Sequence, residues 1–284
     1  MTGNVFDTVR QEYYSLTAAE KKVADFVMSH HAQTQYFSIA ELAEASGVAE
    51  ATVTRFCRRL RFKGYSAFKL AVANAAALQR LPADAPPAGA LTGDGQEELC
   101  QKLYAADTAA IADTLKLLRP ELIRRAVDVL AGARKVLCMG QGGSMIMAQE
   151  AAHLFSTVSG KFFAVSDSHS QMIAAVNLTK EDALLFFSYS GATRELTETL
   201  AVARERGAHI LLVTRFPKSP GAALSELVLP CGSNESPLQL GSVAARIAQL
   251  FLLDVLFGEF CRRDSEACEE NRRRAAAALA EKHL

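Results

Sequence analysis

Two short segments carry glycine and hydroxyl side chains where a phosphate group could bind. The first, GQGGS at residues 140–144, follows an apolar run and places Ser144 at the start of a helical pattern. The second, SYSGAT at residues 188–193, follows another apolar run and opens another helical pattern. Free backbone N–H groups and the helix dipole favour an anion at such positions. The hydroxyl groups can each donate a hydrogen bond to a phosphate oxygen, and Gly191 lets the backbone approach.

Considered alone, the first segment has three interpretations. It could be a tight strand-to-helix turn without a ligand, a dinucleotide site or a monophosphate site. The dinucleotide fingerprint G-x-G-x-x-G/A requires a small third residue where this chain has Met145, which disfavours a pyrophosphate. Asp167, near the end of the second predicted strand, keeps the dinucleotide interpretation open. For the second segment, the alternative to a ligand site is an ordinary helix N-cap.

A third group of side chains that could take part in binding is basic. Residues 38–60 contain two short amphipathic patterns, and Gly47 between them is placed to take the positive φ that ends the first helix. This spacing is typical of a helix-turn-helix. We expect the second helix to begin near residues 49–51. It should bury Val53, Phe56 and Cys57 and leave Thr52, Thr54, Arg55, Arg58 and Arg59 facing outward.

Positive charge is concentrated in and after this second helix. Six basic side chains and no acidic one lie between residues 55 and 69, although the whole chain has 31 Lys and Arg against 31 Asp and Glu. Such a patch can neutralise DNA phosphates and release counterions, so DNA affinity should fall steeply with salt. The alternative is a basic solvated face on a small helical bundle. The expected DNA contacts are Ser38, Ala51, Thr52, Thr54, Arg55, Arg58, Arg59, Lys63, Tyr65 and Lys69.

The periodicity of apolar residues indicates how the chain is divided. Residues 1–78 show helical periodicity only, and the Pro, Gly and Ala-rich residues 79–96 are interpreted as a linker. In residues 97–262, a pair of helical patterns precedes apolar runs at 135, 162, 183, 209 and 226, which alternate with further helical patterns. This predicts an all-α helix-turn-helix domain, then a three-layer α/β domain with a parallel five-stranded sheet. The charged tail, residues 263–284, is expected to form a surface helix.

The composition excludes several classes of protein. The six cysteines are far apart, without a CxxC pair or a Cys/His spacing that suits zinc, so we expect free thiols and no metal. Redox sensing by the thiols is the minor alternative. The N-terminus lacks a signal-peptide pattern, and no later stretch reaches about 18 uninterrupted apolar residues. We therefore expect a cytoplasmic protein that does not interact with membranes.

The segments LTAAEKKVADFV at residues 16–27 and FSIAELAEASGVAEATVTRFCRRLRFKGYSAFKLAV at residues 37–72 resemble the N-terminal domain of the RpiR family of transcriptional regulators. Residues 133–257 resemble the SIS (sugar isomerase) domain, with GQGGS and SYSGAT as its two phosphate loops. SDSH at 166, NESP at 234 and the helix SVAARIAQLFLLDVLF match the RpiR-type version. The resemblance implies a winged or extended helix-turn-helix that binds palindromic operators as a dimer, with residues 63–69 leading into a further helix beside the DNA backbone.

The resemblance also implies which residues bind the ligand. Ser144, Ser188, Ser190 and Thr193 would bind a phosphate. We expect Gly142, Gly143, Tyr189 and Gly191 to complete the phosphate site, and Glu235, Asp167 and His169 to lie near the sugar.

The fold does not decide between an enzyme and a sensor, because SIS domains occur both as aldose–ketose isomerases and as ligand-binding modules. Isomerisation needs a base near the sugar C1–C2 bond, and the candidates Glu235, Glu150, His153 and His169 each have a structural explanation as well. A DNA-binding domain favours a sensor, since an effector can shift operator affinity without turnover.

We therefore predict a DNA-binding regulator of sugar or amino-sugar metabolism, controlled by a six-carbon sugar phosphate or a close relative. It should be a homodimer or homotetramer, without catalytic residues or a cofactor. A sugar-phosphate isomerase and a dinucleotide-sensing regulator remain the alternatives.

Overall fold

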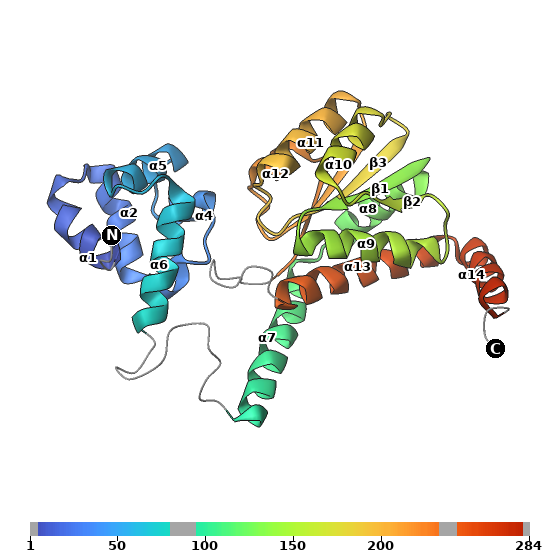
Figure 1. The fold of residues 1–284 in the computed structure, drawn as a ribbon, viewed down its shortest axis with the longest axis horizontal. Helices are drawn as coiled ribbons and strands as arrows, with labels where there is room; N and C mark the ends of the chain where they lie inside the picture. The colour runs from blue at the N-terminus through green and yellow to red at the C-terminus, as the bar shows by residue number, and fades with distance from the viewer. Residues whose placement is uncertain (1–4, 80–94, 233–242, 281–284) are drawn as a thin grey trace. The chain divides into compact units, whose positions relative to one another are not determined.

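The computed structural model describes residues 5–79, 95–232 and 243–280 (Figure 1). The chain divides into two compact units whose boundary, between residues 104 and 105, falls inside a long helix that is described here with the second unit. Most of the proposed linker and Glu235 lie outside the described residues. Within the described ranges, no helix combines the length and the apolar composition needed to cross a membrane.

The described part of the first unit contains helices only. They are α1 (Val5–Glu12), the 3-10 turn η1 (Tyr13–Ser15), α2 (Ala18–Ser29), α3 (His31–Thr34), α4 (Ile39–Ala45), α5 (Glu50–Arg59) and α6 (Tyr65–Gln79). Thr17 and Ser38 cap α2 and α4, each in a reciprocal hydrogen-bond pair with the glutamate three residues later. Gly47 has a φ of +64° between α4 and α5, which confirms the predicted turn.

The core of this unit lies beneath α5. Val53, Phe56 and Cys57 are fully buried, as predicted from the amphipathic pattern. The ring of Phe56 packs edge-on against that of Phe68 on α6, with 5.4 Å between the ring centroids. Helix α6 follows the helix-turn-helix directly, so the extended form of this motif is present in the described residues and not a winged one.

The second unit is built on a parallel sheet with the strand order β2-β1-β3-β4-β5. The strands are β1 (Lys135–Gly140), β2 (Phe162–Ala164), β3 (Asp182–Phe187), β4 (His209–Thr214) and β5 (Leu227–Pro230). The helices are α7 (Gln96–Leu117), α8 (Pro120–Gly132), α9 (Gly143–Ser156), α10 (Ser168–Val176), α11 (Arg194–Glu205), α12 (Pro220–Leu224), α13 (Val243–Arg263) and α14 (Ser265–Ala280). Each of the five apolar runs contributes one strand, so the predicted sheet is confirmed.

Alternate residues of the strands face two different layers of helices (Figure 1). Val136 and Cys138 of β1 belong to the apolar core shared with α8, α9 and α13. Leu137 and Met139 point to the opposite face and belong to the core shared with α11 and α12. Because both faces are covered, the central parts of β1, β3 and β4 are apolar on both sides. The predicted three-layer arrangement is confirmed.

The chain reverses its direction across the sheet between β1 and β3. From β1 it passes through α9 to β2 at one edge, whereas β3 lies on the other side of β1. Gly140 at the end of β1 is in register with Phe187 at the end of β3. The loops that follow these two residues therefore start side by side at the carboxyl edge of the sheet. In open α/β folds, this is the place where ligands bind.

The charged tail forms α14, as predicted. Its contact with the rest of the unit includes the buried Cys268 and a hydrogen bond of 2.8 Å from Nδ2 of Asn271 to the carbonyl of Val158. All six cysteines are free, as the sequence predicts. No group of three metal-binding side chains gathers among the residues that the structure describes.

Candidate functional site

The loop between β1 and α9 has a backbone that accepts only glycine at its first position. A Cβ atom on Gly140 would lie 2.6 Å from the carbonyl oxygen of Ser144. Gly142 is the N-cap of α9, with φ +53° and ψ −126°, and has no side chain to cap the helix. The helix therefore begins at the edge of the sheet. In its first turn the N–H groups of Ser144 and Met145 bond to the carbonyls of Gln141 and Gly142, both at 3.0 Å, so an anion here would rely on the helix dipole and the hydroxyl of Ser144.

We expect Gly140→Ala to lower the free energy of unfolding by about 1–3 kcal/mol, because the clash is with backbone that no side-chain rotation can relieve. Gly160→Ala is the matched control, since a Cβ atom there meets nothing within 4 Å, and its effect should stay within about 0.5 kcal/mol. Thermal unfolding followed by circular dichroism measures both, because the chain has no tryptophan for fluorescence. Equal melting temperatures for the two variants would contradict this account of the loop.

The second loop, between β3 and α11, is stabilised by its own serines. The hydroxyl of Ser188 accepts a hydrogen bond of 3.2 Å from the N–H of Gly191, and that of Ser190 accepts one of 3.3 Å from the N–H of Ala192. A hydroxyl that accepts in this way still has its own hydrogen to donate. Gly191 has a φ of +60°, and a Cβ atom on it would lie 2.1 Å from Oγ of Ser219.

Thr193 ends this loop as the N-cap of α11, but its side chain makes no capping hydrogen bond. Its Oγ1 atom is buried and has no hydrogen-bond partner among the residues that the structure describes. A buried hydroxyl without a partner costs about 1–3 kcal/mol. Most threonine N-caps use this oxygen to bind the helix. The hydroxyl is therefore suited to bind an acceptor that comes from outside the protein chain.

Arg246 brings a positive charge to the first loop. A Cβ atom on Gly143 would lie 3.3 Å from Nη1 of Arg246, so the guanidinium lies against the first turn of α9. A guanidinium beside a helix N-terminus is a strong combination for a phosphate oxygen. The sequence analysis missed this residue, because Arg246 belongs to α13 and only the tertiary fold brings it to the loop.

The two predicted sugar contacts in the described residues follow β2, at the same edge of the sheet. Asp167 is the N-cap of α10 and accepts a hydrogen bond of 2.9 Å from the N–H of Ser170. This hydrogen bond is the main reason why the pKa of Asp167 is lower than usual. His169 is exposed in the first turn of α10. Helix capping thus accounts for Asp167, and the backbone of His169 hydrogen-bonds to the same carboxylate.

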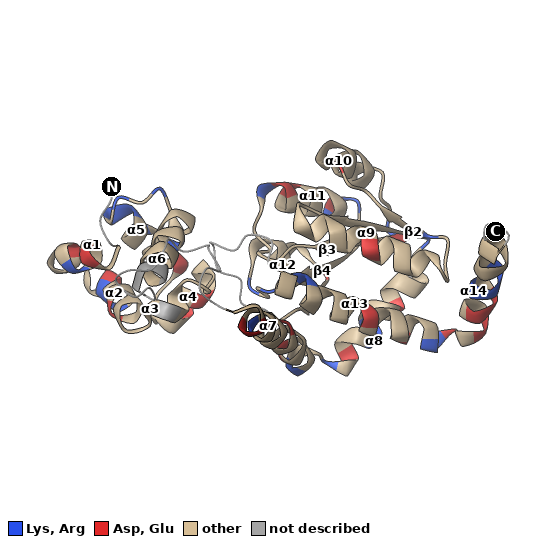
Figure 2. Ribbon diagram, turned by 60° about the horizontal axis from the view of Figure 1, so that its bottom comes forward, with Lys and Arg blue, Asp and Glu red and all other residues tan. Residues whose placement is uncertain are grey.

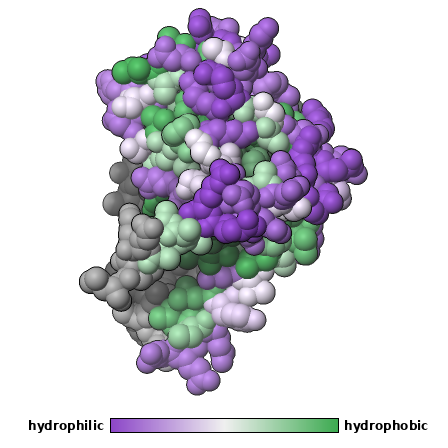
Figure 3. Space-filling view, turned by 90° about the vertical axis from the view of Figure 1, so that its right-hand side faces the viewer, coloured by the Kyte–Doolittle hydropathy of each residue, from purple (hydrophilic) through white to green (hydrophobic). Residues whose placement is uncertain are grey.

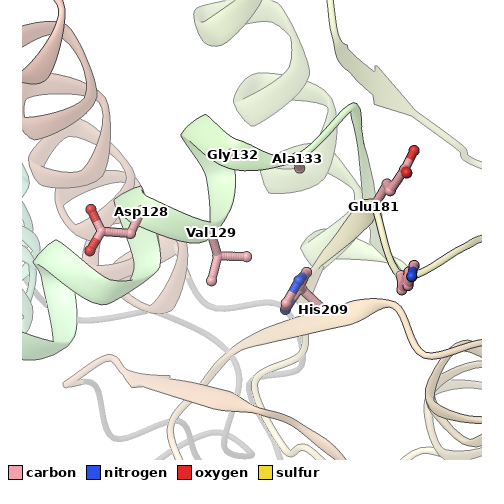
Figure 4. A pocket seen from close by; sticks show the side chains of 7 residues that line it. Asp128, Val129, Gly132, Ala133, Glu181 and His209 are labelled. Carbon is pink, nitrogen blue, oxygen red and sulfur yellow. The ribbon is translucent and has the colours of Figure 1, made fainter.

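A hollow of about 320 Å³ lies at the opposite edge of the sheet, where strands β1, β3 and β4 begin (Figure 4). Asp128, Glu181, Lys180 and His209 contribute to its lining. Asp128 pairs with Arg263, and Nδ1 of His209 lies 2.7 Å from a carboxylate oxygen of Glu226 outside the hollow. Carboxylates in the lining repel a phosphate, so this hollow is not the site that the sequence predicts.

The first unit presents basic side chains on α5 and on the segment that follows it (Figure 2). Ala51, Arg55, Arg58 and Lys63 are exposed, and Thr54 and Lys69 are half-buried. In a helix-turn-helix, this second helix enters the major groove with its N-terminal part.

Thr52, which the sequence analysis places on the outer face of α5, is in fact buried. It is 6% exposed, and its Oγ1 accepts a hydrogen bond of 3.1 Å from Nη2 of Arg55. The prediction of an outward-facing Thr52 is wrong because the buried face of α5 is wider than the amphipathic pattern indicates. Thr52 orients Arg55 and is not itself presented to DNA.

Two other predicted DNA contacts have structural roles. The hydroxyl of Tyr65 donates a hydrogen bond of 2.8 Å to the carbonyl of Phe37, and burial raises the pKa of this phenol far above its usual value. Ser38 is half-buried and caps α4.

Arg59 also contributes to the fold of the first unit. Its Nε lies 3.3 Å from the buried carboxylate of Glu20, and its Nη1 donates to the carbonyl of Ser15 at 2.8 Å. Burial raises the pKa of Glu20, but the hydrogen bonds from Thr17 and the charge of Arg59 outweigh this effect and leave the pKa below its usual value. Arg59 therefore stabilises a buried carboxylate, whereas its neighbour Arg58 is exposed.

Comparison with known proteins identifies both units. Residues 3–79 match the model of the helix-turn-helix domain of the rpiR family, and residues 129–258 match that of the SIS domain. The transcriptional regulator HexR of Pseudomonas aeruginosa is 36% identical over 256 residues, which cover 89% of this chain and 87% of HexR. The chain belongs to the RpiR family of transcriptional regulators.

A further relative and two solved structures are also similar to this chain. An HTH-type transcriptional regulator of Caldanaerobacter subterraneus is 33% identical over 254 residues, which cover 89% of each chain. Among solved structures, the NanR protein of Vibrio vulnificus complexed with ManNAc-6P has a TM-score of 0.86 and 25% identity, covering 99% of this chain and all of NanR. The sugar isomerase domain of an RpiR transcription factor from Sphaerobacter thermophilus has a TM-score of 0.58 and 22% identity, which concerns the fold alone.

Proposed function

We propose that this RpiR-family regulator binds operator DNA with an affinity that a six-carbon sugar phosphate, or a close relative, controls from the SIS domain. The phosphate would bind the first turn of α9 and the hydroxyl groups of Ser144, Ser188, Ser190 and Thr193. The genes under control would serve sugar or amino-sugar metabolism. DNA would contact the exposed side of α5 and the basic segment after it.

The buried hydroxyl of Thr193, which has no partner among the described residues, is the observation that carries this proposal. It lies in a loop that starts beside GQGGS at the carboxyl edge of the sheet. A phosphate has enough acceptor oxygens to take hydrogen bonds from both loops at once. Arg246, held against Gly143, would add a charge-assisted hydrogen bond. A tight turn without a ligand would leave the buried hydroxyl of Thr193, which has no partner among the described residues, without explanation.

The complex of NanR with ManNAc-6P supports a sugar phosphate as the class of ligand. The similarity covers the whole of NanR, so it includes the part that corresponds to the SIS domain here. A dinucleotide fits less well, because buried Met145 occupies the position where the dinucleotide fingerprint has a small residue. We therefore propose a monophosphorylated sugar, without a cofactor.

The positions of two of the four candidate bases favour a sensor over an isomerase. Glu150 and His153 lie on α9, seven and ten residues beyond Gly143. With a rise of about 1.5 Å per residue, they are about 10 and 15 Å along the helix from the phosphate loop. A base that acts on the C1–C2 bond of a bound sugar phosphate must be within hydrogen-bond reach of it. The names of the relatives, which are transcriptional regulators, agree with this proposal.

We also propose that the protein acts as a homodimer or homotetramer. The second unit exposes large apolar side chains on α9, β2 and α10, namely Ile146, Phe163, Ile173 and Val176. Apolar areas interrupt the hydrophilic surface in Figure 3. Large apolar side chains left exposed commonly mark an interface, and helix-turn-helix proteins bind palindromic sites as symmetric dimers. Native mass spectrometry measures the state directly.

The experiment that tests the control of DNA binding is a titration of a labelled promoter fragment with the purified protein. N-acetylmannosamine 6-phosphate, N-acetylglucosamine 6-phosphate, glucose 6-phosphate and fructose 6-phosphate are added in turn. At least one should change the operator affinity by about 5- to 150-fold, which is the usual range of coupling between two sites. No response to any of them would contradict the proposal. Turnover of an aldose phosphate would favour an isomerase, and stabilisation by NAD(H) would favour a dinucleotide sensor.

A further inference from the structure

A buried glutamine, Gln171, lies directly beneath the first phosphate loop. It belongs to α10, and its side chain is fully buried. Its Nε2 donates to the carbonyl of Gly140 at 3.0 Å and to the carbonyl of Val165 at 2.7 Å. Its Oε1 accepts a hydrogen bond of 2.8 Å from Nε2 of Gln141. One amide group thus bonds to three different nitrogen or oxygen partners, and its Nε2 also makes a longer contact of 3.7 Å to Sδ of Met145.

The three partners of Gln171 all border the proposed effector site. Gly140 is the last residue of β1, and Gln141 is the first residue of the glycine loop. Val165 follows β2 and precedes the segment with Asp167 and His169. The N–H of Val165 also bonds to the carbonyl of Cys138 on β1, at 3.1 Å. Gln171 therefore links the two segments that border the site on this side.

We propose that Gln171 is a positioning residue, which holds the GQGGS loop in the conformation that binds phosphate by orienting Gln141 and the carbonyl of Gly140. This inference rests on the proposed function and specifies how the same site is kept ready for its ligand. Neither glutamine touches the phosphate in this account. A site is precise when its binding groups are fixed by such outer hydrogen bonds, because the ligand then does not have to order them.

The chemistry of the glutamine side chain suits this position. Two buried carbonyl groups need donors, and the side chain of Gln141 needs an acceptor. The single amide group of Gln171 supplies both the donors and the acceptor. A glutamate at this position would offer acceptors to two carbonyl oxygens and repel them. A leucine or methionine would leave both carbonyl groups without this donor. The position therefore requires an amide of this length.

The test compares Gln171→Met, Gln171→Glu and Gln141→Met with the unchanged protein. Isothermal titration calorimetry measures the dissociation constants of N-acetylmannosamine 6-phosphate, glucose 6-phosphate and inorganic phosphate. For every probe that the unchanged protein binds, we expect Gln171→Met and Gln141→Met to raise the dissociation constant by about tenfold. Loss of outer hydrogen-bond partners has an effect of this size at metal sites. The factor should be the same for each probe, because the loop holds the phosphate and not the sugar. Gln171→Glu keeps the acceptor for Gln141 but should still weaken binding.

Gln149→Met, on the exposed side of α9, is the control and should leave the dissociation constants unchanged. The double variant Gln141→Met/Gln171→Met should bind no more weakly than Gln171→Met alone, since both changes remove the same hydrogen bond. If Gln171→Met does not fold, Gln141→Met tests the proposal instead, because Gln141 is only half-buried and makes the same hydrogen bond.

Unchanged dissociation constants in the folded variants, whatever their melting temperatures, would overturn the positioning role and leave Gln171 as a purely structural residue. A loss confined to one sugar would overturn it as well. If the unchanged protein bound none of the probes, the proposed function itself would fail, and this inference with it.

Discussion

Replacing Thr193 with valine is expected to weaken the binding of the sugar phosphate by about 10- to 150-fold without destabilising the free protein. The valine has the same shape but lacks the hydroxyl, which has no partner among the described residues and makes no helix cap. A hydrogen bond to a charged group contributes about 1.5–3 kcal/mol, and each 1.4 kcal/mol is a factor of ten in affinity. Isothermal titration calorimetry measures the affinity, and thermal unfolding measures the stability.

The combination of weaker binding and unchanged stability distinguishes a ligand group from a structural one. Thr197→Val is the matched control on the same helix. The hydroxyl of Thr197 already donates to the carbonyl of Arg194 at 2.9 Å, so its loss should leave ligand affinity unchanged. If Thr193→Val lowered the melting temperature and left the affinity as it was, Thr193 would be an ordinary helix cap.

The arrangement of elements in both units could be predicted because it depends on local patterns. The five apolar runs are each long enough for one strand, and the helical patterns between them separate consecutive strands. Parallel strands connected in this way bring the loops after β1 and β3 to the same edge. The positive φ of Gly47 could be predicted because this glycine lies between two helical patterns. The position of the two proposed phosphate loops could therefore be predicted from the sequence.

The side chains that only tertiary packing places could not be predicted. Arg246 and Gln171 reach the first phosphate loop from helices that follow it in the chain, and nothing in their local sequence indicates this. Thr52 looks exposed by periodicity, but the packing around α5 buries it. The amphipathic pattern shows which side of a helix is apolar, but the width of the buried face depends on the neighbouring helices.

Arg58 and Arg59 are adjacent in one basic run, and the local sequence does not distinguish their roles. We expect substitution of Arg58 to weaken DNA binding and substitution of Arg59 to lower the stability of the first unit. The double change Arg55→Ala/Arg58→Ala removes two exposed charges from α5. If each neutralises one phosphate, DNA affinity should fall by about 30-fold per DNA-binding unit at 0.15 M salt, and the slope of log affinity against log salt by about two. The melting temperature should fall only slightly, through loss of the hydrogen bond from Arg55 to Thr52. Fluorescence anisotropy at several salt concentrations gives the slope.

Arg59→Ala should instead lower the stability of the first unit, by about 1–2 kcal/mol, because it leaves the buried carboxylate of Glu20 without its cation. The figure is smaller than for a fully buried pair since the Arg59 side chain is 42% exposed.

The pKa of Glu20 is lowered in the folded state, so the carboxylate stabilises the fold above its unfolded pKa, and this contribution is lost as the pH falls through the folded pKa. Removing the arginine raises the folded pKa, and acid unfolding of the variant should begin at a higher pH than in the unchanged protein. Acid titrations followed by circular dichroism measure this shift. If Arg59→Ala kept the acid stability of the unchanged protein and weakened DNA binding as Arg58→Ala does, Arg59 would belong to the DNA-binding surface.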